Sequence, residues 1–171
     1  SIFLLPLKNI SESLKTNPWI KNIDISTNFK NKLFIKIIEY KAVAIYSFNN
    51  KDYYINNFGK IIDIVDKDFD LNKDFIVFNG NQSNIKAKSI LNIISMYQFS
   101  FNEKIIIANY IGKRRWDLVL ENGIILKLDE KNPNSSLDNY FKLRKNLNNN
   151  EFNSIKEIDL RNFQKAIIKF K

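Results

Sequence analysis

The sequence predicts an α+β protein: a small module of one helix plus strands, followed by a mixed β-sheet domain with two helices. Segments in which apolar and polar residues alternate recur along most of the chain, and this is the pattern of half-buried strands. Apolar residues at helical spacing occur in only a few windows, at 10–15, 86–98 and 135–147. Of the 171 residues, 44% are hydrophobic, which is enough to bury a core in one ordinary domain or two small ones.

The first module is expected to cover residues 1–47. Its helix ends before Pro18, because the residue that precedes a proline is pushed out of the helical region. In its second strand Leu33, Ile35 and Ile37 share one face, since side chains alternate along a strand. The expected elements are a helix at 10–15, strands at 19–25 and 33–40, and a segment at 42–47 that pairs with the next module.

The second module is expected to cover residues 48–171, after a boundary at 48–52. Its clearest feature is a hairpin before the pair Asn122-Gly123, which favours a type I′ turn. In its first strand Trp116, Leu118 and Leu120 alternate with Asp117, Val119 and Glu121. The last strand is expected to be an exposed edge of the sheet. The expected strands are 53–55, 61–65, 75–78, 104–110, 116–121, 124–128, 154–161 and 166–170, with helices at 86–98 and 135–147 and a polar turn at 146–150.

The composition argues against an enzyme. The chain has no Cys and no His, so the commonest general base and the commonest metal ligand are both missing, and no glycine-rich phosphate loop occurs. Asp66, Asp68 and Asp70 have the first spacings of a calcium loop, but Leu71 and Val77 stand where that loop needs Gly and Glu. We therefore expect no catalytic site, no metal and no cofactor.

The net charge of +9 is compatible with nucleic acid, anionic lipid or an acidic protein as partner. The lysines are spread along the chain, whereas nucleic-acid binders concentrate their cations on one face or in a tail. The run Lys113-Arg114-Arg115-Trp116 could stack a nucleobase. The preferred interpretation places Trp116 in the core and pairs a neighbouring arginine with carboxylates, while leaving open that an arginine contacts a partner.

Four segments in this order resemble the FtsQ/DivIB family of bacterial cell-division proteins. Residues 17–25 (NPWIKNIDI) with 33–46 are similar to the second half of that family's POTRA domain, although Ala42 or Val43 stands where proline is usual. Residues 53–64 (YYINNFGKIIDI) are similar to the hairpin that opens its β domain. The segments RRWDLVLENGIILKL and IDLRNFQKAIIKF resemble its two most recognisable strands.

The resemblance implies a non-enzymatic scaffold with one transmembrane helix upstream, in the bacterial inner membrane at the division septum, with this region in the periplasm. It implies binding of FtsB, with FtsL, by addition of a strand to the last strand of the sheet. The family often has an aromatic residue where Asn162 stands and small residues where Gln164 and Lys165 stand. Carried over by position, the binding residues are Arg114, Arg161, Asn162, Gln164, Ala166 and Phe170.

Two other hypotheses remain at this stage. One is a different POTRA-type module that receives unfolded polypeptide during envelope assembly or secretion. The other is a binder of anionic lipid or nucleic acid, whose affinity would fall steeply with salt.

Overall fold

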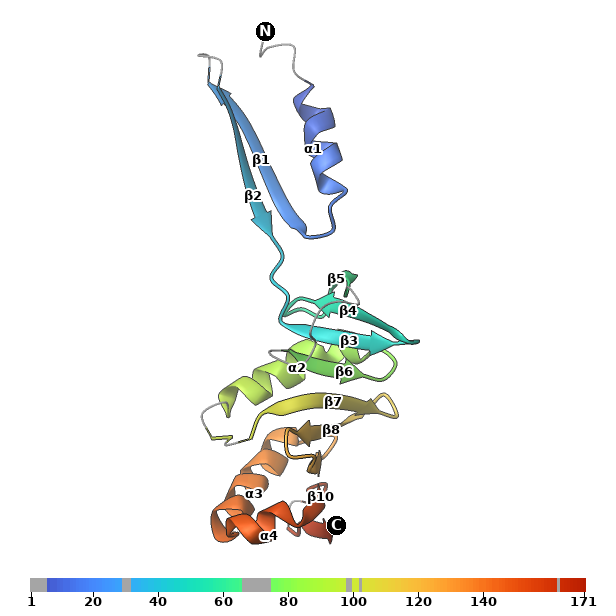
Figure 1. Cartoon of the computed structure of the whole chain (residues 1–171), viewed down its shortest axis with the longest axis vertical. Helices are drawn as coiled ribbons and strands as arrows, with labels where there is room; N and C mark the ends of the chain where they lie inside the picture. The colour runs from blue at the N-terminus through green and yellow to red at the C-terminus, as the bar shows by residue number, and fades with distance from the viewer. Residues whose placement is uncertain (1–5, 29–31, 66–74, 98–99, 102, 163) are drawn as a thin grey trace. The chain divides into compact units, whose positions relative to one another are not determined.

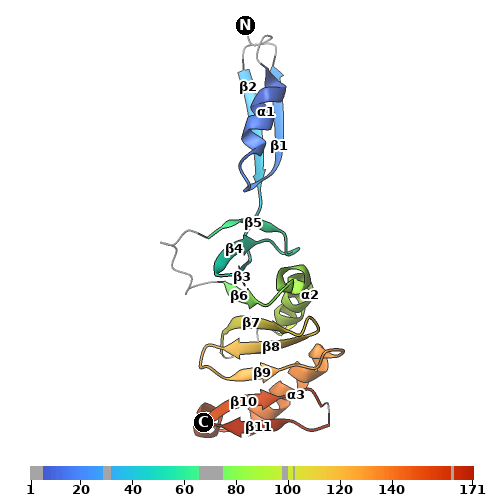
Figure 2. The same cartoon turned by 90° about the vertical axis from the view of Figure 1, so that its right-hand side faces the viewer.

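The computed structural model of the chain describes residues 6–28, 32–65, 75–97, 100–101, 103–162 and 164–171 (Figures 1 and 2). It divides into two units, Ser1–Ala42 and Val43–Lys171, each with its own sheet. The predicted α+β class, a helix with strands followed by a mixed sheet with helices, is confirmed.

The first unit consists of α1 (Leu7–Lys15), β1 (Ile20–Asn28) and β2 (Lys32–Glu39). The two strands pair antiparallel and place Ile23 opposite Ile37 and Ile25 opposite Ile35. Among the described residues of this unit no hydrophobic side chain is fully buried, and α1 likewise has no buried residue. Its apolar residues therefore contribute less to stability than those of the second unit.

The second unit is built on one nine-stranded sheet with the strand order β11-β10-β9-β8-β7-β6-β3-β4-β5. The pairs β3–β6, β6–β7 and β9–β10 are parallel and the others are antiparallel. Parallel neighbours need a crossover connection. It contains α2 between β6 and β7, and α3 with α4 between β9 and β10, whereas between β3 and β6 the chain passes through β4 and β5. The elements are β3 (Ala44–Phe48), β4 (Lys51–Ile55), β5 (Ile61–Ile64), β6 (Ile76–Asn79), α2 (Ser83–Met96), β7 (Ile105–Ile111), β8 (Arg115–Leu120), β9 (Ile125–Lys127), α3 (Pro133–Asn146), α4 (Asn149–Asn153), β10 (Ile155–Asp159) and β11 (Ile167–Phe170).

The core lies between one face of this sheet and the helices α2 and α3, which line up along the same side of the strands in Figure 2. Ala87 and Ile90 of α2, and Leu137 and Tyr140 of α3, are buried in it. Because side chains alternate along a strand, the residues in register across the sheet share this face. They form the row Tyr46, Phe78, Ala108, Leu118, Leu126 and Ile158.

The boundary between the units lies between Ala42 and Val43, earlier than the expected division at 47/48. The reason is that β3 pairs with β4 and β6 and so belongs to the second sheet, as expected for segment 42–47. Residues 48–52, where the boundary was expected, form the β3–β4 hairpin turn and the strand ends beside it. Asn49 and Asn50 both have positive φ, 51° and 58°, as a two-residue type I′ turn requires.

The turn between β8 and β9 is not type I′, so that prediction is wrong. Gly123 has a φ of 85°, but Asn122 is not in the positive-φ region. The N–H of Gly123 donates to the carbonyl of Leu120 over 2.8 Å, and the N–H of Leu120 donates to the carbonyl of Ile124 over 2.9 Å. This is a three-residue loop with glycine in the left-handed position.

The polar segment predicted as a turn at 146–150 contains the start of a third helix of this unit, α4. A reciprocal capping box begins it: the N–H of Glu151 donates to Asn148 Oδ1 and the N–H of Asn148 donates to Glu151 Oε2, both over 2.9 Å. Phe152 then anchors α4 in the core. No helix in the described ranges is long and apolar enough to cross a membrane.

Candidate partner-binding edge

The strand β11 ends the nine-stranded sheet, with β10 as its only strand neighbour in the described part of the chain. Its outer side therefore carries a row of backbone N–H and C=O groups available for pairing. Ile168 is half-buried and packs against the core, whereas Ile167 and Phe170 are 53% and 61% exposed. Of the two isoleucines only Ile168 faces the core, because adjacent residues of a strand point to opposite faces.

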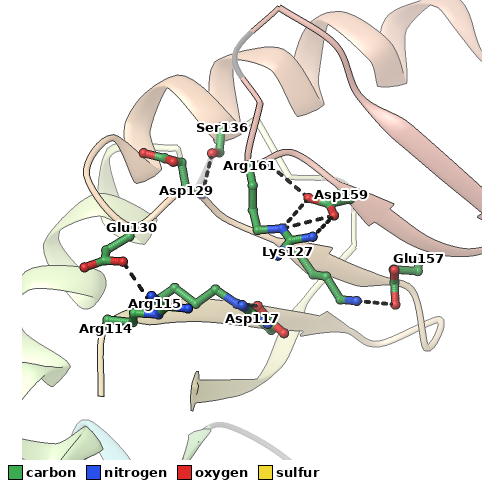
Figure 3. Close-up of polar contacts among 10 residues, drawn as sticks. All are labelled: Arg114, Arg115, Asp117, Lys127, Asp129, Glu130, Ser136, Glu157, Asp159 and Arg161. Carbon is green, nitrogen blue, oxygen red and sulfur yellow. Dashed lines mark hydrogen bonds and ion pairs between the residues drawn. The ribbon is translucent and has the colours of Figure 1, made fainter. Parts of the chain in front are cut away.

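Arg161 follows β10 directly and is held by Asp159. Its Nε donates to Oδ1 and Oδ2 of Asp159 over 2.8 and 3.0 Å, and its backbone N–H donates to Oδ1 over 3.1 Å (Figure 3). These hydrogen bonds hold the pKa of the Asp159 carboxyl below its usual value and raise the pKa of Arg161. The arginine side chain stays 48% exposed, so it is oriented without being enclosed.

Ser136 holds Leu160, the residue that precedes Arg161. Its buried Oγ accepts the N–H of Asp129 over 2.9 Å and donates to the carbonyl of Leu160 over 3.0 Å. Ser136 lies inside α3, which begins earlier than the expected residue 135, with Pro133 in its first turn. A hollow of about 280 Å³ beside Ser136 is lined by Asp129, Lys131 and Arg161 among others.

Arg114 lies in the turn between β7 and β8. Its Nε is 3.7 Å from Oε2 of Glu130, and both side chains are about half exposed or more. It borders a second hollow, of about 270 Å³, which also includes Lys131. Arg114 and Arg161 thus flank the same loop at 129–132, and each is paired with a carboxylate of its own chain.

The expected core role of Trp116 is confirmed. The side chain is buried, and its ring centroid lies 4.6 Å from that of Tyr110 and 5.5 Å from that of Phe78. The expected ion pairing of a neighbouring arginine is also confirmed, because Arg115 Nε lies 3.3 Å from Oδ1 of Asp117.

The other predicted binding residues lie between β10 and the end of β11. Asn162 shapes the connection, since its Oδ1 accepts the N–H of Gln164 over 2.9 Å, an Asx-type turn. Ala166 is half-buried and packs against the core just before β11. Phe170 lies on β11 itself.

The face of the sheet away from the helices carries a group of charged side chains that the sequence pattern did not predict (Figure 3). Lys127 Nζ of β9 lies 2.8 Å from Oε2 of Glu157 on β10, and Lys169 Nζ of β11 lies 3.3 Å from Oε1 of the same carboxylate. The hydrogen bonds from Lys127 and Lys169 hold the pKa of Glu157 below its usual value. The alternation of charged and apolar residues predicts that the charged side chains of one strand lie on one face. Which charges meet across strands depends on the order and register of the strands.

The aspartates considered as a calcium loop, Asp66, Asp68 and Asp70, lie outside the described residues. Elsewhere in the chain as described, no group of three or more His, Cys, Asp or Glu side chains is placed to hold a metal ion.

Comparison with known proteins gives two adjoining family matches. Residues 44–161 match the model of the C-terminal region of cell division protein FtsQ/DivIB, and residues 1–40 match the POTRA domain of FtsQ type. The junction between the two matches agrees with the division between the two structural units.

Cell division protein FtsQ of Rickettsia typhi is 34% identical over 169 residues, covering 98% of this chain and 61% of that protein. FtsQ of Rickettsia prowazekii is also 34% identical, over 168 residues with the same coverage, and FtsQ of Bradyrhizobium diazoefficiens is 26% identical over 138 residues, covering 80% of this chain and 39% of that protein. The chain thus spans 61% of the length of its Rickettsia relatives. It belongs to the FtsQ/DivIB family of cell division proteins.

Proposed function

We propose that this chain is the periplasmic part of a non-enzymatic divisome scaffold that binds FtsB, with FtsL, by β-strand addition at β11. In this proposal a transmembrane helix upstream anchors the protein in the inner membrane at the septum. There it links early and late division proteins to septal peptidoglycan synthesis. The observation that carries the proposal is the position of β11 at the end of the sheet, with one strand neighbour in the described part of the chain.

Strand addition suits this edge because the backbone supplies the affinity and the side chains supply the selectivity. Phe170 and Ile167 offer exposed apolar surface on the two faces of β11. Asp159 holds the Arg161 guanidinium in one orientation, and in the complex a carboxylate of the partner would bind the same guanidinium. Such a rim charge contributes more to orientation and association rate than to raw affinity.

The test is a proline scan of β11, with binding of a peptide from the membrane-proximal periplasmic region of the same organism's FtsB measured by calorimetry. Proline replaces Ile167, Ile168 and Lys169 one at a time, and alanine at the same position is the matched control. Successive N–H groups of an edge strand point alternately toward β10 and outward. Proline removes one donor and is tolerated where that donor faces solvent.

We expect successive positions of the scan to differ: proline should impair peptide binding at one position and the stability of the fold at the next. Where the N–H points outward, proline should weaken peptide binding by roughly tenfold relative to the matched alanine variant, about the worth of one lost hydrogen bond, and the two variants should melt at the same temperature. Where it points to β10, proline should lower the melting temperature. Unchanged affinity in every folded proline variant would contradict strand addition at β11.

A further inference from the structure

The charges on the open face of the sheet alternate in sign from strand to strand. Asp117 on β8 stands opposite Lys127 on β9, and Lys127 stands opposite Asp159 on β10. One row further along, Glu157 on β10 stands opposite Lys169 on β11. The first row therefore runs negative, positive, negative and ends with Ile167 on β11, whereas in the next row Glu157 is followed by a cation, Lys169, on the edge strand.

Lys169 is the exposed member of this series. Lys127 and Lys169 share the carboxylate of Glu157, but their side chains are 22% and 65% exposed. An ammonium group has three donors, so Lys169 can hold Glu157 and a second carboxylate together. Glu157 thus orients the lysine along the open face of the sheet and leaves most of its side chain exposed at the edge strand.

The segment that carries this edge contains cations but no acidic residue of its own. From Leu160 to Lys171 the sequence contains Arg161, Lys165, Lys169 and Lys171 and neither Asp nor Glu. Pairing β11 with the β11 of a second copy would bring these cations together, and like charges directly opposite destabilise a strand pair. Lysine on an edge strand is also a known protection against self-association. The charge distribution therefore disfavours a second copy and favours an acidic strand.

The opposite face of β11 is apolar. Ile168 packs against the core, and Phe170 lies on the same face of the strand because it is two residues away. An added strand must therefore present apolar residues to this face, whereas the other face offers it both the charge of Lys169 and the exposed side chain of Ile167.

We infer that Lys169, positioned by Glu157, selects a partner strand in which an acidic residue adjoins Lys169 and apolar residues occupy the alternate positions beside Ile168 and Phe170. This inference rests on the proposed strand addition and specifies which strand the edge accepts. Lys169 is then a specificity-determining residue, and the added strand continues the alternation of charge from Glu157 on β10 to Lys169 on β11.

The experiment is a double-mutant cycle between the chain and the FtsB peptide. Each acidic residue of the peptide is changed to Gln in turn, and affinity is measured for the parent chain, Lys169→Gln and Lys145→Gln. Lys145 is an exposed lysine near the end of α3 and is the matched control. Thermal melting checks that each variant is folded, and sedimentation measures the oligomeric state of the chain alone.

One acidic position should account for the effect. Its change to Gln should weaken binding about two- to fivefold for the parent chain and Lys145→Gln, the size expected for a cross-strand charge pair, and leave binding to Lys169→Gln unchanged. Equal losses in the parent chain and Lys169→Gln would overturn this inference while leaving strand addition intact. Absence of any peptide binding to the folded parent chain would overturn both proposals, and a dimer formed through β11 would assign the edge to a second copy.

Discussion

Glu157 is the residue on which the charged face of the sheet depends, because its carboxylate accepts from lysines on both neighbouring strands. Lys127 lies on β9 and Lys169 on β11, so this one side chain ties three strands together. Its side chain is only 14% exposed, which reduces screening by solvent relative to an ordinary surface pair.

The pH dependence of the free energy of unfolding should show how much the carboxylates of Glu157 and Asp159 stabilise the fold. The pKa values of Glu157 and Asp159 are lowered from 4.5 and 3.8 by hydrogen bonds from Lys127 and Arg161 respectively. A lowered carboxyl pKa stabilises the fold above the unfolded value, and this stabilisation is lost as the pH falls through the folded value. We expect the free energy of unfolding to fall below about pH 4.5, and to fall less steeply in Glu157→Gln.

Urea unfolding between pH 3 and pH 6 is the measurement, with about three pH values on each side of the expected fall. Glu121→Gln removes an exposed carboxylate in the β8–β9 turn and is the matched control. Identical slopes for Glu157→Gln and the parent chain would show that the group of charged side chains contributes nothing to stability.

At the scale of elements, the β4–β5 turn is joined to the start of α2 through Gly59. Asn84 Nδ2 of α2 donates to the carbonyl of Gly59 over 3.0 Å. Gly59 has a φ of 77°, and a Cβ atom there would lie 1.8 Å from the carbonyl oxygen of Asn84. The close approach of turn and helix therefore requires glycine, both for its conformation and for its lack of a side chain.

Alanine substitutions at Gly123 and Gly59 separate the cost of the backbone conformation from the cost of the close approach. Gly123→Ala should cost about 1 kcal/mol, because Gly123 has a φ of 85° with no atom within 4 Å of the added Cβ and so meets only conformational strain. Gly59→Ala should cost roughly 2–5 kcal/mol, because a clash with backbone is added to the same strain. Urea unfolding measures both, and equal losses would mean that the β4–β5 turn moves away from α2 at little cost.

At the scale of the whole molecule, stability is concentrated in the second unit. Every hydrophobic residue found fully buried in the described ranges, from Ala44 to Leu160, belongs to it. In the first unit Phe34, Ile35, Ile37 and Ile38 are each more than 40% exposed.

A fragment of residues 43–171 should therefore melt cooperatively at the temperature of the main transition of the whole chain. A fragment of residues 1–42 should show no cooperative transition, because a two-stranded hairpin without a buried core is marginal in water. Calorimetry and circular dichroism of the two fragments are the measurements. A large fall in the melting temperature of 43–171 would show that the first unit stabilises the second.

The sequence by itself determined the elements whose signal is local. The alternation around Trp116 and Leu118 predicted the β8–β9 hairpin, and the helical spacing around Ile90 and Tyr140 predicted α2 and α3. The short helix α4 was missed, because its sequence is mostly Asn and it depends on a capping box and on burial of Phe152. The sequence also predicted one feature of the candidate site, the position of β11 at the exposed edge of the sheet.

Only the tertiary structure decided which residues meet across the sheet. Lys127 and Glu157 lie on neighbouring parallel strands, but α3 and α4 separate those strands in the sequence. The partner of Arg114, Glu130, became clear for the same reason, because β8 and β9 separate the two residues in the sequence. Periodicity shows which face a side chain occupies, because it follows from the local geometry of one strand or helix. The order of strands depends on how the whole chain closes its core, and no local pattern specifies that.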